Sequence, residues 1–254
     1  MYKAFDLTGR KALVTGGNGG IGLGMAKALL QSGADVAIWG SNPDKTDGAV
    51  QQLSGEGGQV IGFSCDVGDE SAVEACFART LDALGGLDAC FANAGVSATP
   101  VKINDMSSEE FRRVQRINVD GVFYTFRAAA RHMIDNGGGS LVATASTAAV
   151  EGAARNSHYG ASKGAVTSYV RALAVELARH QIRVNSILPG WIETEMTARA
   201  FGDERFAANV MPRIPARRWG SIDDFGGIAV YLMSDASSYT TGEQFLIDGG
   251  YTKF

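Results

Sequence analysis

Three side chains in the second half of the sequence could together move a proton. Tyr159 and Lys163 are four residues apart, so on a helix they lie on one face, one turn from each other. A cation beside a phenol favours the phenolate and could bring this weak acid into use near neutral pH. Ser146 follows an apolar run, 140–145, that resembles a strand. On these residues alone, a core tyrosine and a solvated lysine are the simpler interpretation, which only a cofactor site elsewhere would overturn.

The elements that must position these side chains alternate between strand-like and helix-like patterns. Alternating strands and helices indicate parallel βαβ units, and we therefore expect an α/β fold with a single doubly wound parallel sheet and helices on both faces. No repeat or linker interrupts residues 1–254, which we take as one domain. The predicted strands are Lys11–Thr15, Asp35–Trp39, Gln59–Cys65, Leu87–Ala92, Ser140–Ala145, Ile182–Leu188 and Gln244–Ile247, and the predicted helices are Gly19–Ser32, Pro43–Leu53, Asp69–Leu84, Ser107–Asp135, one containing Tyr159, and Ile222–Ser234.

Composition indicates a soluble globular protein. The 254 residues are 45% hydrophobic and 20% charged, and a net charge of −4 argues against nucleic acid or an anionic membrane as a partner. No run is long enough to span a membrane, and the first residues lack the apolar core of a signal peptide. The three scattered cysteines suit a reduced protein, no Cys/His spacing suggests a metal site, and we expect a cytoplasmic location.

A glycine-rich loop follows the first strand and opens the first helix. Glycine at such a turn lets the backbone approach a pyrophosphate closely, and the amides at the helix N-terminus face the anion. The strand–loop–helix context therefore favours dinucleotide binding over a purely structural turn. The cofactor-binding residues predicted here are Gly16, Asn18, Gly20, Ile21 and Gly22.

The end of the second strand bears on the choice of cofactor. A carboxylate at this position would bind a ribose 2′-hydroxyl, but the turn after Trp39 has none. The small polar residues Ser41 and Asn42 could instead receive a 2′-phosphate, although no Arg or Lys stands at the turn. We therefore favour NADP(H) as the cofactor, with NAD(H) possible.

Two further segments follow strands at the same edge of the sheet. Asp66 could accept a hydrogen bond from an adenine amino group while Val67 packs on the ring, although a charge at a helix N-terminus explains Asp66 equally well. Asn93, Ala94 and Gly95 end the fourth strand, where the asparagine can brace strands and the glycine allows a cofactor close.

Together these motifs resemble those of the short-chain dehydrogenase/reductase family over essentially the whole chain. The shared pattern consists of Thr15-Gly16-xxx-Gly20-Ile21-Gly22, Asn93-Ala94-Gly95, Asn118, Ser146, Tyr159-xxx-Lys163 and Pro189-Gly190, in this order. The resemblance implies a Rossmann fold and an oxidoreductase that transfers a hydride between a nicotinamide cofactor and a small carbonyl or secondary alcohol.

The resemblance also implies a role for each matching residue. Tyr159 is the general acid or base, and Ser146 hydrogen-bonds the substrate oxygen. Lys163 lowers the pKa of the tyrosine and holds the nicotinamide ribose, while Asn118 holds a water in a proton relay. Both Tyr159 and Lys163 also count as cofactor contacts, as do Pro189, Gly190, Ile192 and Thr194 after the sixth strand.

The substrate pocket is less well defined by the sequence. Its expected walls are 96–97, 148–156 and a short lid, approximately 191–218. Trp191 and Phe201 could line an apolar pocket, and Arg155 or Glu193 could meet a polar substituent of the substrate. For each of these residues, ordinary loop packing or a solvated charge is the better interpretation. Within the family the chain resembles 3-oxoacyl carrier-protein reductases and sugar or secondary-alcohol dehydrogenases. Segment 135–139 lacks basic residues for a carrier protein, which favours a small free substrate.

The same features bear on the oligomeric state of the protein and on two alternative functions. The helix over 107–135 and the one containing Tyr159 carry apolar residues on more than one face, and the closing strand resembles one that packs across a tetramer. We therefore expect a homotetramer. Deeper burial within the monomer is the alternative explanation for the apolar faces of the two helices. A catalytically silent dinucleotide sensor could lose its catalytic residues, but all four are present here. A methyltransferase on a similar fold would have no use for the Tyr-Lys pair.

Overall fold

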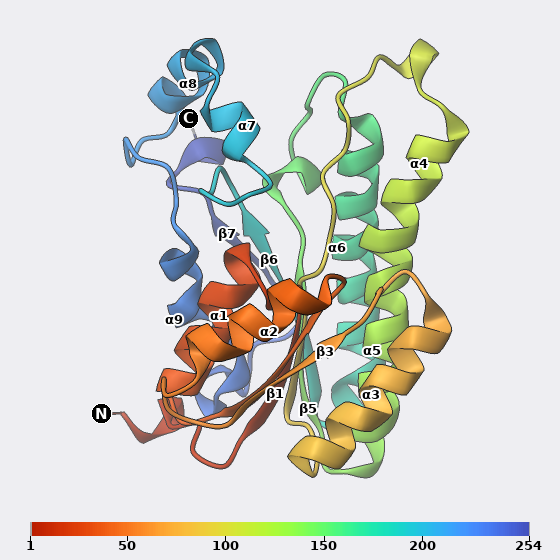
Figure 1. The fold of residues 1–254 in the computed structure, drawn as a ribbon, viewed down its shortest axis with the longest axis vertical. Coiled ribbons are helices and arrows are strands. Elements are labelled where there is room, and N and C mark those ends of the chain that lie inside the picture. Colours follow the sequence, from red (N-terminus) through yellow and green to blue (C-terminus); the bar gives the residue numbers. More distant parts are fainter. Residues whose placement is uncertain (1, 254) are drawn as a thin grey trace.

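A single seven-stranded sheet forms the centre of the computed structural model, which describes residues 2–253 (Figure 1). All neighbouring strands are parallel, in the order β3-β2-β1-β4-β5-β6-β7. The predicted fold class is confirmed, and the ends of the predicted strands differ from the observed ones by at most two residues. The strands are β1 (Lys11–Thr15), β2 (Asp35–Gly40), β3 (Val60–Ser64), β4 (Ala89–Ala92), β5 (Gly139–Thr144), β6 (Ile182–Pro189) and β7 (Gln244–Ile247).

Helices cover both faces of this sheet (Figure 1). Helices α1 (Gly20–Gln31), α2 (Pro43–Leu53) and α9 (Gly226–Met233) contribute buried residues to one hydrophobic cluster, and α3 (Glu70–Leu84), α5 (Gly121–Asp135) and α6 (Ser157–Leu177) to the other. Alternate residues of β1 enter the two clusters: Leu13 packs on the α3 side, and Ala12 and Val14 pack on the α1 side. The central strands are apolar throughout because both of their faces are buried.

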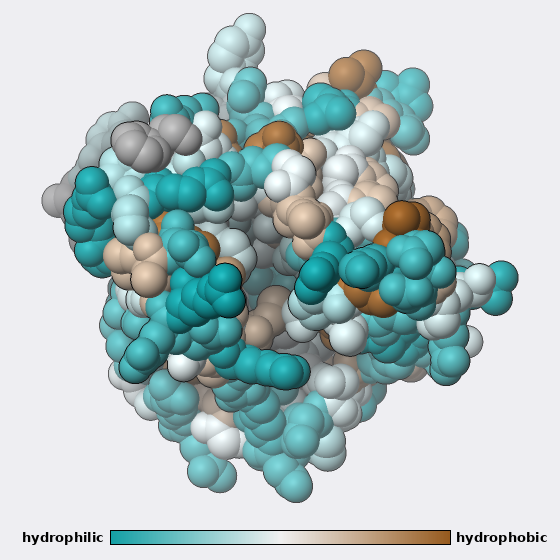
Figure 2. All heavy atoms as spheres, turned by 90° about the horizontal axis from the view of Figure 1, so that it is seen from above, coloured by the Kyte–Doolittle hydropathy of each residue, from teal (hydrophilic) through white to brown (hydrophobic). Residues whose placement is uncertain are grey.

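The strand order places a crevice at the carboxyl edge of the sheet. β1 pairs with β2 on one side and with β4 on the other, so the crossovers after these strands leave in opposite directions. In open α/β sheets, ligands bind at such a switch point. Seen from this edge, the molecule is hollowed near its middle and mostly hydrophilic around the hollow (Figure 2).

The long helix predicted over 107–135 is interrupted. It consists of α4 (Ser108–Gln115), a π-helical turn over Arg116–Asp120, and α5. Such turns are frequent at functional sites, and this one contains Asn118, whose side chain is fully buried. Hydrophobic periodicity cannot distinguish a π turn from the surrounding α-helix, because it adds a single residue to the repeat.

The segment after β6 forms a small body of its own. It contains α7 (Ala198–Phe201) and α8 (Glu204–Val210). The ring of Trp191 contacts that of Phe206, with centroids 4.9 Å apart, and Phe201 stacks on Trp219 at 4.1 Å. Trp191 also packs edge-on against Tyr251. Both predicted pocket aromatics, Trp191 and Phe201, are therefore engaged in a separate aromatic cluster.

Two other observations concern the cysteines and the helices. The three cysteines, Cys65, Cys76 and Cys90, are buried and unpaired. Within residues 2–253, no helix combines the length and the apolar character needed to cross a membrane.

Candidate active site

The glycine-rich loop has the geometry required to hold a pyrophosphate. Gly16 has a φ of 63°, in the left-handed region that favours glycine. A Cβ on Gly22 would lie 2.3 Å from the carbonyl oxygen of Gly16, so no larger residue fits between loop and helix. Helix α1 begins at Gly20, and its N-cap, Gly19, offers no side chain to the first amides. These amides are available to an anion, and the loop therefore fits a dinucleotide.

Side chains from the end of β2 lie beside this loop. Asn18 Nδ2 donates to Thr46 Oγ1 at 3.1 Å, and its amide fills the space that a Cβ on Gly40 would need. Asn42 caps α2 by accepting from the backbone N–H of Lys45 at 3.0 Å, and Ser41 is exposed. Asn18, Ser41 and Asn42 thus form one polar surface next to the loop.

Lys45 is a candidate cofactor residue that the sequence did not indicate. Its ammonium group lies 2.9 Å from the position that a Cβ on Gly19 would occupy, directly over the glycine-rich loop. It also pairs with Glu195 at 2.5 Å, which brings residues 150 positions apart together across the crevice. In the sequence Lys45 lies inside the predicted helix, and a lysine in the first turn of a helix carries no signal of its own.

The segments after β3 and β4 reach the same edge. Asp66 accepts from Gly68 N at 2.9 Å and from Arg116 Nη1 at 3.0 Å, and Asp69, not Asp66, is the N-cap of α3. Val67 is only 6% exposed and packs against Gly121 of α5, which leaves little of its side chain for an adenine ring.

Asn93 joins three strands. Its Nδ2 donates to the carbonyl of Thr15 at 3.1 Å, while its Oδ1 accepts from Thr144 Oγ1 at 3.0 Å. The hydroxyl of Thr15 in turn accepts from the backbone N–H groups of Asn93 and Ala94, both at 3.0 Å. Ala94 is thereby held against Gly16.

The residues after β6 close the crevice from the other side. Pro189 is the last residue of β6, and the N–H of Gly190 donates to the carbonyl of Ile247 at 3.0 Å. Ile192 is buried, and Thr194 lies over the start of α1, where a Cβ on Gly20 would be 3.3 Å from its Cγ2. The post-β6 segment and the glycine-rich loop are therefore neighbours.

Tyr159, Ser146 and Lys163 meet at the base of the crevice. Ser146 lies just beyond β5, and Tyr159 and Lys163 are in the first two turns of α6. Burial raises the pKa of the Tyr159 phenol, and a hydrogen bond with Ser146 acts in the opposite direction. Lys163 Nζ lies 5.7 Å from the centroid of the tyrosine ring and donates to the carbonyl of Thr144 at 2.8 Å. Burial lowers the pKa of Lys163 to about 8, so its ammonium is still charged at neutral pH.

Asn118 and Gly95 adjoin this group. A Cβ on Gly95 would lie 3.2 Å from Asn118 Oδ1 and 3.5 Å from Lys163 Nζ, so the three residues line one narrow space. The Asn118 amide accepts from Val96 N at 2.8 Å and donates to Val96 O and to Ser162 Oγ. Its side chain is therefore committed to protein partners.

Comparisons with known proteins agree with this geometry. A family model described as enoyl-(acyl carrier protein) reductase matches residues 16–252. The chain is 36% identical to the 3-oxoacyl-[acyl-carrier-protein] reductase of Chlamydia pneumoniae, over 97% of this chain and 98% of the relative.

Solved structures give the same result. A short-chain type dehydrogenase/reductase from Mycobacterium marinum superimposes with a TM-score of 0.93 at 41% identity, with 98% of each chain covered. A gluconate 5-dehydrogenase from Burkholderia cenocepacia, in complex with NADP and tartrate, gives a TM-score of 0.94 at 32% identity, covering 99% of this chain and 98% of that one. With the dinucleotide loop and the Ser-Tyr-Lys group at one sheet edge, these matches show that the chain belongs to the short-chain dehydrogenase/reductase family.

Proposed function

We propose that this protein is an oxidoreductase that transfers a hydride between NADP(H) and a small carbonyl compound or the corresponding secondary alcohol. The observation that carries the proposal is the convergence of Ser146, Tyr159 and the buried, charged Lys163 beside a dinucleotide loop. A catalytically silent sensor would have no need to keep a charged lysine buried, because such a charge costs stability.

The chain supplies the proton and the electrostatics of this reaction. A bound nicotinamide supplies or accepts the hydride. Tyr159 gives its phenolic proton to the carbonyl oxygen during reduction and takes it back during oxidation. Ser146 hydrogen-bonds the same oxygen and stabilises the negative charge that develops there. The Lys163 ammonium stabilises the phenolate that remains, because an opposite charge nearby favours an ionised group.

The positions of the residues around the crevice support the following proposed cofactor contacts. Gly16, Gly20, Ile21 and Gly22 would hold the pyrophosphate, and Asp66 would lie beside the adenine, with only the small exposed part of Val67 reaching the ring. Lys163 would bind the nicotinamide ribose, and Asn118 would hold the water of the proton relay through its backbone, because its side chain is committed to Val96 and Ser162. The residues that would surround the nicotinamide ring are Asn93, Ala94, Gly95, Tyr159, Pro189, Gly190, Ile192 and Thr194.

The adenosine end favours NADP(H) over NAD(H). Asn18, Ser41 and Asn42 present no carboxylate to a 2′-phosphate, and Lys45 supplies a cation above the loop. The similar gluconate 5-dehydrogenase of known structure was solved with NADP. NAD(H), which lacks the phosphate, remains an alternative cofactor with weaker binding.

The proposed substrate is a small hydroxylated ketone of the keto-gluconate type. The similar gluconate 5-dehydrogenase contains tartrate, a small hydroxylated acid, beside its NADP. Arg155 is exposed at the predicted pocket wall, where a guanidinium can bind a carboxylate in two-pronged fashion. A 3-oxoacyl carrier-protein substrate is the second candidate, because the relative from Chlamydia pneumoniae has that activity in its name.

A substrate panel separates these candidates. Reduction of 5-keto-D-gluconate, L-sorbose and acetoacetyl-coenzyme A is measured by the absorbance loss at 340 nm, with NADPH and NADH in turn. We expect the highest kcat/KM with NADPH and a keto-sugar compound. Preference for the acetoacetyl thioester would select the second candidate, and preference for NADH would contradict the assignment of the adenosine end.

Two further proposals concern the domain organisation and the segment after β6. We infer that residues 1–254 act as one catalytic domain in which 191–218 is a lid over the substrate, whose Glu195 contacts Lys45 at the exposed rim of the crevice. Limited proteolysis tests the lid, since saturating NADPH should protect it. Protection confined to other segments would contradict this role.

We also infer that the protein is a cytoplasmic homotetramer. On α5 and α6, Phe123 is 39% and Val175 82% exposed, and Tyr239 near β7 is fully exposed, which leaves apolar surface for neighbouring subunits. Three unpaired buried cysteines suit a reducing compartment. A monomeric mass by light scattering at micromolar concentration would contradict the tetramer.

A further inference from the structure

The segment after β4, residues 96–101, has no regular secondary structure and begins at the predicted pocket wall, 96–97; we call it the strap. Four of its residues are bound by backbone hydrogen bonds to other parts of the chain. Val96 exchanges two with Asn118, at 2.8 and 3.1 Å, and Val101 N donates to Arg155 O at 2.9 Å. The other two attachments, at Ser97 and Thr99, come from charged side chains of α4.

Glu110 is the centre of these α4 attachments. Its Oε1 accepts from Thr99 N at 3.0 Å and from Arg113 Nη2 at 2.9 Å, and its Oε2 accepts from Arg113 Nε at 2.7 Å. Arg113 Nη2 also donates to the carbonyl of Ser97 at 3.0 Å. The hydrogen bond with Arg113 is the main reason why the pKa of Glu110 falls to about 2. A charged, two-pronged pair of this kind is directional and holds its partners in a defined place.

His158 reaches Glu110 from the opposite side. It immediately precedes Tyr159 in α6, and its side chain is 0% exposed. Its Nε2 lies 3.5 Å from Glu110 Oε1, yet neither ring nitrogen has a hydrogen-bond partner among residues 2–253. Buried polar groups without partners are uncommon, and each one in a native protein calls for a physical reason.

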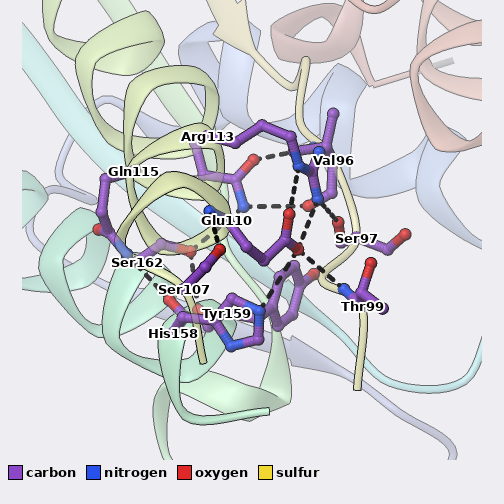
Figure 3. A network of polar contacts seen from close by, with 11 residues as sticks. Val96, Ser97, Thr99, Ser107, Glu110, Arg113, Gln115, His158, Tyr159 and Ser162 are labelled. Atoms are coloured by element: carbon purple, nitrogen blue, oxygen red, sulfur yellow. Dashed lines mark hydrogen bonds and ion pairs between the residues drawn. The ribbon is translucent and has the colours of Figure 1, made fainter. Parts of the chain in front are cut away.

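The backbone around His158 is tied to the same elements. Gln115 Nε2, from the end of α4, donates to the carbonyl of His158 at 3.0 Å. Ser162 Oγ donates to the carbonyl of Tyr159 at 2.7 Å and accepts from Asn118 Nδ2 at 3.2 Å. Figure 3 shows Glu110 between Arg113 and the strap on one side and the turn of helix that carries His158 and Tyr159 on the other. Strap, α4 and the catalytic turn therefore form one connected unit.

We propose that Glu110 and His158 are positioning residues that fix the strap, and with it one wall of the substrate pocket, relative to the phenol of Tyr159. Glu110 holds the strap directly, through Thr99 and through Arg113. His158 sets the place of Glu110, because the buried imidazole occupies the space beneath the carboxylate and offers it a polar face. The proposal extends the proposed function, since it concerns the binding of the carbonyl substrate at the same site.

A purely structural role for the pair would have different consequences. Loss of general stability would reduce the amount of active protein and weaken cofactor and substrate binding together. Loss of positioning would act on the substrate side alone, because the strap attachments do not involve the glycine-rich loop. The two roles are therefore distinguished by comparing KM for the carbonyl compound with the Kd of NADPH.

The test uses the full chain and three variants, Glu110→Gln, His158→Phe and the double variant, with Glu109→Gln as the matched control. Glu109 is the exposed neighbour of Glu110. For Glu110→Gln we expect amide exchange in the strap to accelerate at least ~10-fold, while the interior of α6 stays protected. With 5-keto-D-gluconate as substrate, KM should rise ~10-fold, with kcat within about a factor of two and the Kd of NADPH unchanged.

The double variant tests the link between the two residues. If His158 acts through Glu110, the double variant should have the same KM and strap exchange as Glu110→Gln alone. The proposal would be overturned if the effects of the two single variants on KM multiplied in the double variant. Unchanged amide exchange of the strap in Glu110→Gln, or a parallel rise in the Kd of NADPH, would also overturn it. Should Glu110→Gln fail to fold, Arg113→Lys, which keeps the charge but loses the fork, is expected to loosen the strap in the same way.

Hydrogen exchange requires neither substrate nor cofactor. If the panel compounds are not reduced at all, the proposed function fails while the strap result is still decided. A loosened strap with normal KM for 5-keto-D-gluconate would overturn the positioning role and leave the proposed function intact.

Discussion

The two sides of the crevice are built by different means. On the cofactor side, the shape comes from backbone and close packing: the Gly16 turn, the contact of Gly22 with the loop, and the bridging amide of Asn93. On the substrate side, exposed segments are held by charged and aromatic side chains, such as the Glu110–Arg113 fork and the stacked Phe201 and Trp219.

The difference indicates which part of the site is adjustable. Steric constraints of the backbone leave few alternatives, so the cofactor side tolerates little change. Ion pairs and surface aromatic contacts can be exchanged one at a time, with modest effects on stability. A family that keeps its cofactor but varies its substrate would be expected to divide its site in this way.

The largest effect is expected from the residue between the two sides. Tyr159→Phe removes only the proton donor, so kcat should fall ~10²–10⁴-fold, the usual contribution of general acid–base catalysis. The Kd of NADPH, measured by fluorescence titration, should remain within about a factor of three of the wild-type value. A variant that keeps most of its kcat would show that another group transfers the proton.

A substitution in the glycine-rich loop should weaken cofactor binding through a steric clash. Gly22→Ala places a Cβ 2.3 Å from Gly16 O, and relieving such overpacking costs about 1–3 kcal/mol, so we expect the Kd of NADPH to rise up to ~100-fold. Gly48→Ala is the matched control, because nothing lies within 4 Å of its added Cβ. Equal affinities of both variants for NADPH would mean that the loop is more adaptable than its packing indicates.

Lys163 should show opposite effects on stability and activity. Burial lowers its pKa from 10.5 to about 8, which corresponds to an unfolding free energy lower by about 3 kcal/mol at pH 7. Lys163→Met should lower kcat, because it removes the charge that stabilises the Tyr159 phenolate, yet raise Tm by ~6–12 °C at pH 7.

The pH dependence of this gain has a definite sign. Between pH 8 and 10.5 the unfolded chain binds the lysine proton more tightly than the folded one, so wild-type stability recovers relative to Lys163→Met as pH rises through this window. Thermal unfolding of both proteins from pH 7 to pH 10.5 measures the difference. If Lys163→Met were less stable than the wild type at pH 7, the buried ammonium would be compensated by contacts beyond its hydrogen bond to Thr144.

The smallest effect tests the one charged side chain assigned to the cofactor's phosphate. Lys45→Ala should raise the Kd of NADPH ~10-fold, since hydrogen bonds to charged groups contribute about 1.5–3 kcal/mol, and should leave that of NADH unchanged. Lys27→Ala, in α1 and paired with Glu56, is the control. A similar loss for both cofactors would place Lys45 at the pyrophosphate instead of the 2′-phosphate.

Most of the fold could be predicted from the sequence because each element carries its own signal. The strands are short apolar runs, buried on both faces, and glycines and polar residues mark their ends. The π turn at Asn118 could not be found in this way, because its hydrogen-bond shift leaves the apolar spacing nearly unchanged. The apolar Trp191 and Phe201 carried no sign that they pack with Phe206 and Trp219.

Some residues of the candidate site could likewise be predicted from the sequence, and others could not. Ser146, Tyr159 and Lys163 could be named from spacing and resemblance, and the structure brings them together. Lys45 could not be named, because its importance depends on Gly19, 26 positions earlier, and on Glu195, 150 positions later. His158 stands next to the catalytic tyrosine, but only the fold shows that its ring is buried against Glu110. Long-range contacts of single side chains are what sequence patterns do not encode.

Transfer of isotopic label is the most direct test of the central claim. NADPH carrying deuterium at both positions of the reactive nicotinamide carbon is mixed with 5-keto-D-gluconate and the wild-type protein, and the product is analysed by mass spectrometry, with Tyr159→Phe alongside. We expect one deuterium on the new carbinol carbon with the wild type, and almost none with the variant. NADPH oxidation without deuterium in the product, or equal labelling by both proteins, would contradict hydride transfer with Tyr159 as the proton donor.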